Sequence, residues 1–189
     1  MFQVYLSLGI DHILNVNAYD HILFLIALCA AYAATDWKRI LILVTAFTIG
    51  HSITLALSAL NIISVKPDLV ELLIPITILL TALQNLIVKP NPKKRWRPNY
   101  FLALSFGFIH GMGFSNYFKA LLGKEANIIT PLFGFNVGVE MGQICIVIVI
   151  MILNYLVVGL GKLPQRKWNI IVSIIAGFFS VYMIILKLK

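Results

Sequence analysis

The stretch ITPLFGFNVGVEMGQICIVIVIMILNYLVVG (129–159) carries only one charged residue, Glu140. Crossing the hydrocarbon core of a bilayer takes roughly 20 apolar residues. This run exceeds that length, so we expect it to tilt, kink or project from the membrane. Similar apolar runs cover 20–35, 40–62, 69–88, 99–121 and 168–187. The pattern predicts an all-α fold, a polytopic transmembrane helix bundle with about six spans.

Composition supports a membrane protein. Apolar residues make up 60% of the chain and charged residues 12%, unlike the balance of a soluble domain. The connections between runs are too short to hold a second domain, so residues 1–189 are expected to form a single transmembrane domain. Residues 1–16 are apolar too, but Asp11 and His12 interrupt them. They predict a short helix that lies on the membrane surface or is tucked into the bundle.

The basic residues predict an orientation. The net charge is +8, and the charges lie between apolar runs, which suits anionic lipid headgroups better than nucleic acid. The connections after the first, third and fifth spans hold Lys38, Arg39, Lys89, Lys93, Lys94, Arg95, Arg97, Lys162, Arg166 and Lys167. The opposite side holds Lys66, Lys119, Lys124, Lys187 and Lys189. Because the more basic side faces the cytoplasm, both termini are predicted to lie outside.

Several ionisable residues fall inside the predicted spans, where an unpaired charge is costly. His51 and His110 lie about halfway along their spans, as does Glu140. Asp20 and His21 open the first span, and we expect them at its outer edge. A cluster reaching from the midplane to the outer leaflet is therefore geometrically feasible.

Imidazole nitrogens together with a carboxylate are ligands for nickel, cobalt or zinc. The candidate metal ligands are His21, His51, His110, Glu140 and Asp20. The simpler alternative is that each histidine is a hydrogen-bonded packing residue and that Asp20 caps the first span. Asp20 can also orient His21, because carboxylates commonly hold the second nitrogen of a ligating histidine.

Other polar and small residues surround these candidates. One helical stripe carries Asn136, Glu140 and Gln143. The two amides are either interhelical hydrogen-bond partners or ligands. Ser52 follows His51 directly. His12, with Asp11, fits a solvated surface pair better than an external capture site.

Glycines flank the same regions. Gly134, Gly138 and Gly142 recur every fourth residue, which allows a neighbouring helix to approach closely. Gly107, Gly111 and Gly113 surround His110 and indicate room for another group beside its ring.

Four motifs stand in order along the chain: AYDHILFLIAL (18–28), FTIGHSITLALS (47–58), FGFIHGMGF (106–114) and FNVGVEMGQ (135–143). Together they resemble the HupE/UreJ family of small bacterial membrane proteins, in the branch without a long signal-bearing N-terminus. Position by position, the resemblance selects Asp20, His21, His51, Ser52, His110, Asn136, Glu140 and Gln143. Members encoded with hydrogenase or urease genes are regarded as nickel or cobalt permeases. The resemblance therefore implies transport across a bacterial inner membrane.

The leading hypothesis is a permease for a divalent transition metal, with nickel or cobalt as the expected ion. The ion would pass Asp20 and His21, then rest among His51, His110 and Glu140. Because ligands must be deprotonated to bind, uptake should weaken as the pH falls. The expected partners are the lipid bilayer and the metal ion, with no nucleic acid; a homo-oligomer is left open.

Two alternatives remain at this point. An intramembrane zinc-dependent hydrolase could use the same cluster, with Asp20 or Glu140 as general base and Ser52 contributing. A helix-bundle accessory protein with a structural metal, or with none, is the other. A transporter is favoured over an enzyme.

Overall fold

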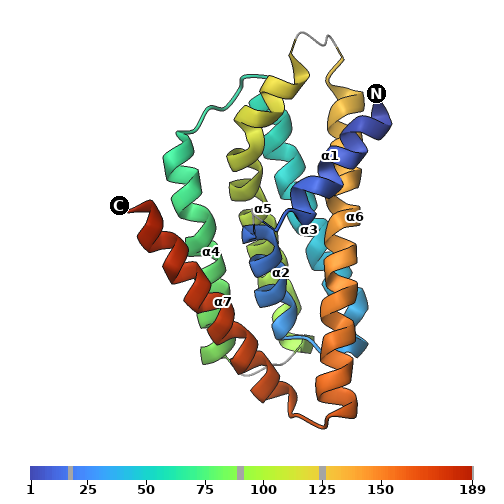
Figure 1. Cartoon of the computed structure of the whole chain (residues 1–189), viewed down its shortest axis with the longest axis vertical. Coiled ribbons are helices and arrows are strands. Elements are labelled where there is room, and N and C mark those ends of the chain that lie inside the picture. The colour runs from blue at the N-terminus through green and yellow to red at the C-terminus, as the bar shows by residue number, and fades with distance from the viewer. Residues whose placement is uncertain (17–18, 89–91, 124–126, 189) are drawn as a thin grey trace.

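The computed structural model describes residues 1–16, 19–88, 92–123 and 127–188, and the side chains within these ranges apart from 92–98. Most of the described residues are helical and none lies in a strand, which confirms the all-α prediction. The helices are α1 (Phe2–Leu14), α2 (Asp20–Ala30), α3 (Trp37–Ala59), α4 (Pro67–Ile87), α5 (Pro92–Leu122), α6 (Ile129–Asn154) and α7 (Gln165–Lys187). A 3-10 turn, Ala34–Asp36, precedes α3 (Figure 1).

Four helical segments among the described residues are long and apolar enough to cross a membrane. They are Ala34–Ala59, Pro67–Ile87, Ile129–Leu160 and Gln165–Lys187. The third is the over-long run, and its last turns, Tyr155–Leu160, widen into a π-helix. The membrane character is therefore confirmed, whereas six crossings stay a prediction.

The first expected span, 20–35, is not one continuous helix. Helix α2 has 11 residues and α1 has 13, so they measure about 16 and 20 Å, and neither alone crosses a core about 30 Å thick. In Figure 1, α1 descends from the N-terminus to the middle of the bundle, and α2 begins there and continues downward. The two short helices together run the height of the bundle as one broken helix.

Side chains from α6 and α7 form hydrogen bonds with the backbone at and just after the C-terminal end of α2. Gln165 Nε2 donates to the carbonyls of Ala30 and Tyr32, at 3.1 and 3.0 Å, and Asn154 Oδ1 accepts the N–H of Ala34 at 3.0 Å. Carbonyls left free where a helix ends need such partners, above all inside a membrane protein. The chain can therefore leave the helical conformation after Ala30.

Glycines bring α1 against α6. A Cβ on Gly138 would lie 2.1 Å from the Leu6 carbonyl oxygen, and one on Gly9 would lie 2.1 Å from that of Phe135. The predicted close approach at the every-fourth-residue glycines is confirmed, and the neighbouring helix is α1. The segment 1–16 is thus tucked into the bundle rather than spread on its surface.

A second close contact joins α3 and α5. A Cβ on Gly107 would lie 2.1 Å from the Phe47 carbonyl oxygen, and one on Gly111 would lie 2.5 Å from that of His51. The interpretation of these two glycines as room beside the His110 ring was wrong, because the backbone of α3 fills that space. Their effect is to bring His51 and His110 to one level of the bundle.

The helix directions place both termini in the same half of the bundle, on opposite sides of it. The N-terminus and the end of α7 both lie in the upper half of Figure 1. The connections between α2 and α3 and between α6 and α7 lie at the lower end, near Lys38, Arg39 and Lys167. We call this the basic end of the bundle.

Candidate metal centre

All four histidines of the chain meet where α1 ends and α2 begins. His12 lies in the last turn of α1, His21 in the first turn of α2, and His51 and His110 in the middle of α3 and α5. Ring centroids are 4.7 Å apart for His12 and His21 and 5.2 Å for His21 and His110. His51 lies 6.0 Å from His12 and 6.4 Å from His21. We call these four residues the histidine cluster.

Several ring nitrogens of the histidine cluster have no hydrogen-bond partner. One ligand atom from each of His12, His21 and His51 lies within 4.8 Å of the other two. His21, His51 and His110 are at most 4% exposed. Among the described side chains, the buried imidazole nitrogens without a hydrogen-bond partner are His12 Nε2, His21 Nε2, both nitrogens of His51, and His110 Nε2. Buried polar atoms normally have partners, so this concentration of lone ring nitrogens fits a metal-binding role.

Hydrogen bonds at Nδ1 determine which nitrogen of two rings can bind a metal. Asp20 Oδ1 lies 3.1 Å from His21 Nδ1, and it also accepts the His21 backbone N–H at 2.9 Å. His110 Nδ1 lies 2.9 Å from the Phe106 carbonyl oxygen, which can only accept. Both rings therefore carry the proton on Nδ1 when neutral, which leaves the Nε2 lone pair available.

Aromatic rings enclose the cluster. Phe114 and Phe135 contact it from α5 and α6, with ring centroids 4.0 Å from His12 and 6.2 Å from His51 respectively. Phe24, Phe47 and Phe106 lie on the opposite side. These apolar neighbours keep the surroundings of low polarity, which strengthens electrostatic interactions within the cluster.

A hollow on the surface of the bundle extends to Asp20, the partner of His21. It has a volume of about 240 Å³, and its lining residues are Tyr19, Asp20, Glu71, Ile74, Met183, Leu186 and Lys187. Asp20 is 19% exposed there and binds His21 within the bundle. Glu71 pairs with Lys187 at the wall of this hollow. We call it the acidic vestibule.

The structure does not bring Glu140 to the histidines. Its Oε1 accepts the hydroxyl of Thr45 at 2.7 Å, and Thr45 lies on an exposed face of α3. Glu140 is not among the described residues whose ligand atoms meet within 4.8 Å. The carboxylate that does contact the cluster is Asp20.

Of the supporting polar residues, Asn136 lies beside the histidine cluster, whereas Gln143 and Ser52 bond to α3. Asn136 lies beside His51, without a hydrogen bond of normal geometry between them, and its Nδ2 donates to a main-chain carbonyl one turn back. Gln143 is fully buried and accepts the Thr48 hydroxyl at 2.8 Å, which joins α3 and α6. Ser52 donates to the Thr48 carbonyl at 2.6 Å. A hydroxyl bonded to its own helix does not favour Ser52 as a catalytic group.

Two placements expected from the sequence were wrong. His12 is not part of a solvated surface pair; only Asp11 is exposed, whereas the His12 ring packs against His21 and Phe114. Asp20 and His21 form the start of α2, which begins in the middle of the bundle rather than at its edge, because α1 occupies the other half (Figure 1). The available signal was the shortness of both apolar runs, which fall on either side of the polar stretch around Asn15.

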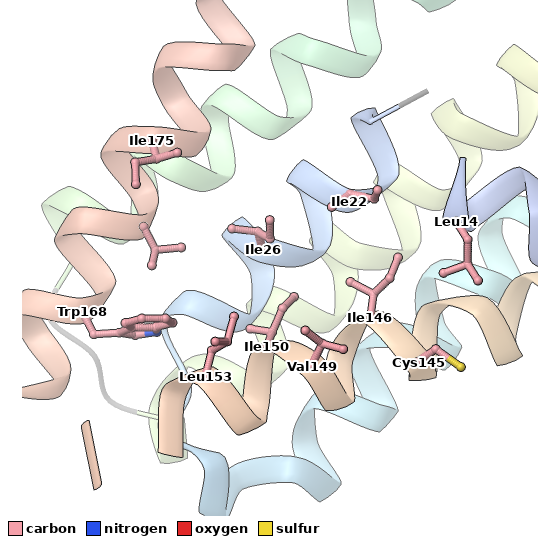
Figure 2. A pocket seen from close by; sticks show the side chains of 11 residues that line it. Leu14, Ile22, Ile26, Cys145, Ile146, Val149, Ile150, Leu153, Trp168 and Ile175 are labelled. Atoms are coloured by element: carbon pink, nitrogen blue, oxygen red, sulfur yellow. The ribbon is translucent and has the colours of Figure 1, made fainter. Parts of the chain in front are cut away.

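A larger apolar groove lies apart from this centre. It has a volume of about 450 Å³ between α2, α6 and α7, and aliphatic side chains such as Ile22, Ile26 and Ile150 line it with Trp168 and Cys145 (Figure 2). Such a lining suits lipid chains rather than an ion. The groove is therefore not part of the candidate metal centre.

The fold and the cluster define a helical membrane protein with a histidine-rich centre at a broken helix. Residues 1–187 match the family model described as HupE / UreJ protein, so the chain belongs to the HupE/UreJ family. No curated protein and no solved structure matches the chain.

Proposed function

We propose that this protein is a permease for a divalent transition metal ion, with nickel or cobalt as the cargo. The observation that carries the proposal is the convergence of four histidines, with five unpartnered ring nitrogens, at the break between α1 and α2. Membership of the HupE/UreJ family supports it. A nitrogen-rich ligand set suits Ni²⁺, Co²⁺ and Zn²⁺ and disfavours Mg²⁺ and Ca²⁺, which prefer oxygen.

The broken helix favours transport over a structural metal. Many secondary transporters bind their ions near the bilayer midplane, where a discontinuous helix exposes backbone groups and can rearrange. Here the ligand His12 belongs to one half-helix and His21 to the other. A relative movement of α1 and α2 would therefore change the ligand set directly.

The acidic vestibule provides an entry route in this proposal. Asp20 stands at its inner end, and its charge attracts a cation before the ion reaches His21. The cluster then exchanges the ion's water ligands for imidazoles. The positive-inside rule places the vestibule on the outer side of a bacterial inner membrane, so that transport runs toward the basic end.

Binding and flux can be tested on one preparation of the full chain. Purified protein is titrated with Ni²⁺, Co²⁺ and Zn²⁺, and the same protein is reconstituted in liposomes that hold a fluorescent chelator. Wild type should bind metal and admit it. His51→Ala should lose both, whereas Ser58→Ala, a change at a buried polar residue on the same helix, should keep both.

Two results would contradict the proposal. If metal binds but never enters the liposomes, the cluster serves another purpose than transport. If His51→Ala and Ser58→Ala behave alike, the histidine cluster does not hold the ion.

A further inference from the structure

Below the histidine cluster, three helices repeat one arrangement. Phe24 follows His21 by three residues in α2, Phe47 precedes His51 by four in α3, and Phe106 precedes His110 by four in α5. Helix α2 runs toward the basic end, whereas α3 and α5 run away from it (Figure 1). All three phenylalanines therefore lie one turn from their histidine, on the side of the basic end.

These three rings form a layer in which Phe24 contacts both of the others. The centroids of Phe24 and Phe47 are 4.9 Å apart, and those of Phe24 and Phe106 are 5.8 Å apart. The layer contacts the cluster directly, since Phe47 lies 5.1 Å and Phe24 lies 5.6 Å from His110. The rings are 6% exposed or less. The three rings therefore lie directly beside the histidine cluster, on the side of the basic end.

A small polar cavity lies beyond the layer. Its volume is about 10 Å³, close to the room that one water molecule needs. Thr81, Gln84 and Asn85 of α4 and Asn99 of α5 line it, and Phe106 forms part of its wall. Gln84 Nε2 donates to Asn99 Oδ1 at 3.3 Å, and Asn85 Nδ2 donates to the Ala27 carbonyl at 2.7 Å. We call it the amide cavity.

The chemistry of the amide cavity differs from that of the cluster. Its hydroxyl and amide groups are uncharged, and they can replace water around a cation without holding it as tightly as imidazoles do. Conduction needs sites that an ion can leave as well as enter. A weak oxygen site one step beyond a strong nitrogen site meets that need.

We infer that Phe24, Phe47 and Phe106 form an aromatic gate, and that the amide cavity is the next station of the metal ion on its way toward the basic end. The inference rests on the proposed function, because it requires that the ion cross the protein. In this inference the aromatic gate and the amide cavity control how fast the ion crosses the protein, whereas the histidine cluster binds the ion. Changes in the gate or the cavity should alter flux while binding in the histidine cluster persists.

The test measures Ni²⁺ affinity and liposome flux for matched pairs of variants. Phe106→Ala removes a gate ring and should raise flux by about tenfold with unchanged affinity. Phe118→Ala is its control, since Phe118 is equally buried on α5 but packs against Tyr5 and Phe135, away from the gate. Thr81→Val removes an oxygen from the amide cavity and should lower flux by about tenfold, again with unchanged affinity. Thr77→Val, one turn away and outside the cavity lining, should change neither.

The outcomes separate this inference from the proposed function. If wild type transports Ni²⁺ but Phe106→Ala and Phe118→Ala change flux equally, the gate is overturned. If Thr81→Val and Thr77→Val change flux equally, the amide cavity is overturned as a station of the ion. Either result leaves the proposed permease function intact. Absence of flux in wild type overturns both the inference and that function. If Phe106→Ala does not fold, Phe106→Leu keeps an apolar side chain at the site, and it should still raise flux above wild type.

Discussion

Single side chains fix the ring orientations in the candidate metal centre. The Nδ1 atoms of His21 and His110 are engaged by Asp20 and by the Phe106 carbonyl, so each ring is held with Nε2 free. Such bonds fix the ring orientation and make the free nitrogen a better ligand. Asp20 is therefore a positioning residue for His21 as well as the inner end of the acidic vestibule.

The first prediction compares the two intramembrane carboxylates. Asp20→Asn should lower metal affinity by about 10–100-fold, the usual effect of losing the partner of a ligating histidine. Glu140→Gln should leave affinity near that of wild type, because Glu140 is bonded to Thr45 rather than to the cluster. Titration calorimetry on both variants measures this difference. A larger loss in Glu140→Gln would restore Glu140 as the ligand that the sequence suggested.

The second prediction concerns His12, which the sequence alone placed on the surface. His12→Ala should weaken metal binding by at least about tenfold, since it removes one of three converging ligand atoms. Asp11→Ala is the control, because this neighbour is exposed and its carboxylate accepts the hydroxyl of Ser7 in the same helix. Equal metal affinities in the two variants would remove His12 from the ligand set.

At the scale of helices, hydrophobic length predicted most elements but missed the broken one. Runs such as 69–88 and 168–187 agree with α4 and α7 within a few residues, because uninterrupted apolar length is a local property. The end-to-end arrangement of α1 and α2 depends on contacts with α6 that lie far away in the sequence. The positions of His12, Asp20 and His21 follow from that arrangement. The shortness of the two apolar runs signals a break in the helix, but it does not show that these three residues meet.

The third prediction tests the contact that positions α1. Gly9→Ala places a methyl group 2.1 Å from the Phe135 carbonyl oxygen, so α1 must shift away from α6 and carry His12 with it. Such overpacking costs about 1–3 kcal/mol, and metal affinity should fall as well. Gly177→Ala is the matched control, since its nearest neighbour would be the Ala82 Cβ at 3.6 Å. Thermal unfolding and metal titration should both separate the two variants, and equal behaviour would argue against the role of α1.

At the scale of the whole molecule, the two ends of the bundle differ in charge. Lys66 and Lys167 are both exposed; Lys66 lies in the connection between α3 and α4, and Lys167 lies in the first turn of α7, at the opposite end of the bundle. In variants with the native cysteines replaced, Lys66→Cys should react with an impermeant thiol reagent in intact cells. Lys167→Cys should react only after the cells are opened, because the basic end faces the cytoplasm. The reverse pattern would place the acidic vestibule on the cytoplasmic side.

The charge distribution, the broken helix and the histidine cluster support one central claim: the imidazoles at the junction of α1 and α2 hold the transported metal ion. X-ray absorption of the zinc-loaded protein tests this claim most directly, because multiple scattering from imidazole rings identifies histidine ligands. We predict scattering from at least the three converging rings of His12, His21 and His51, with Zn–N distances of about 2.0–2.1 Å. A spectrum of oxygen ligands without imidazole scattering would contradict it.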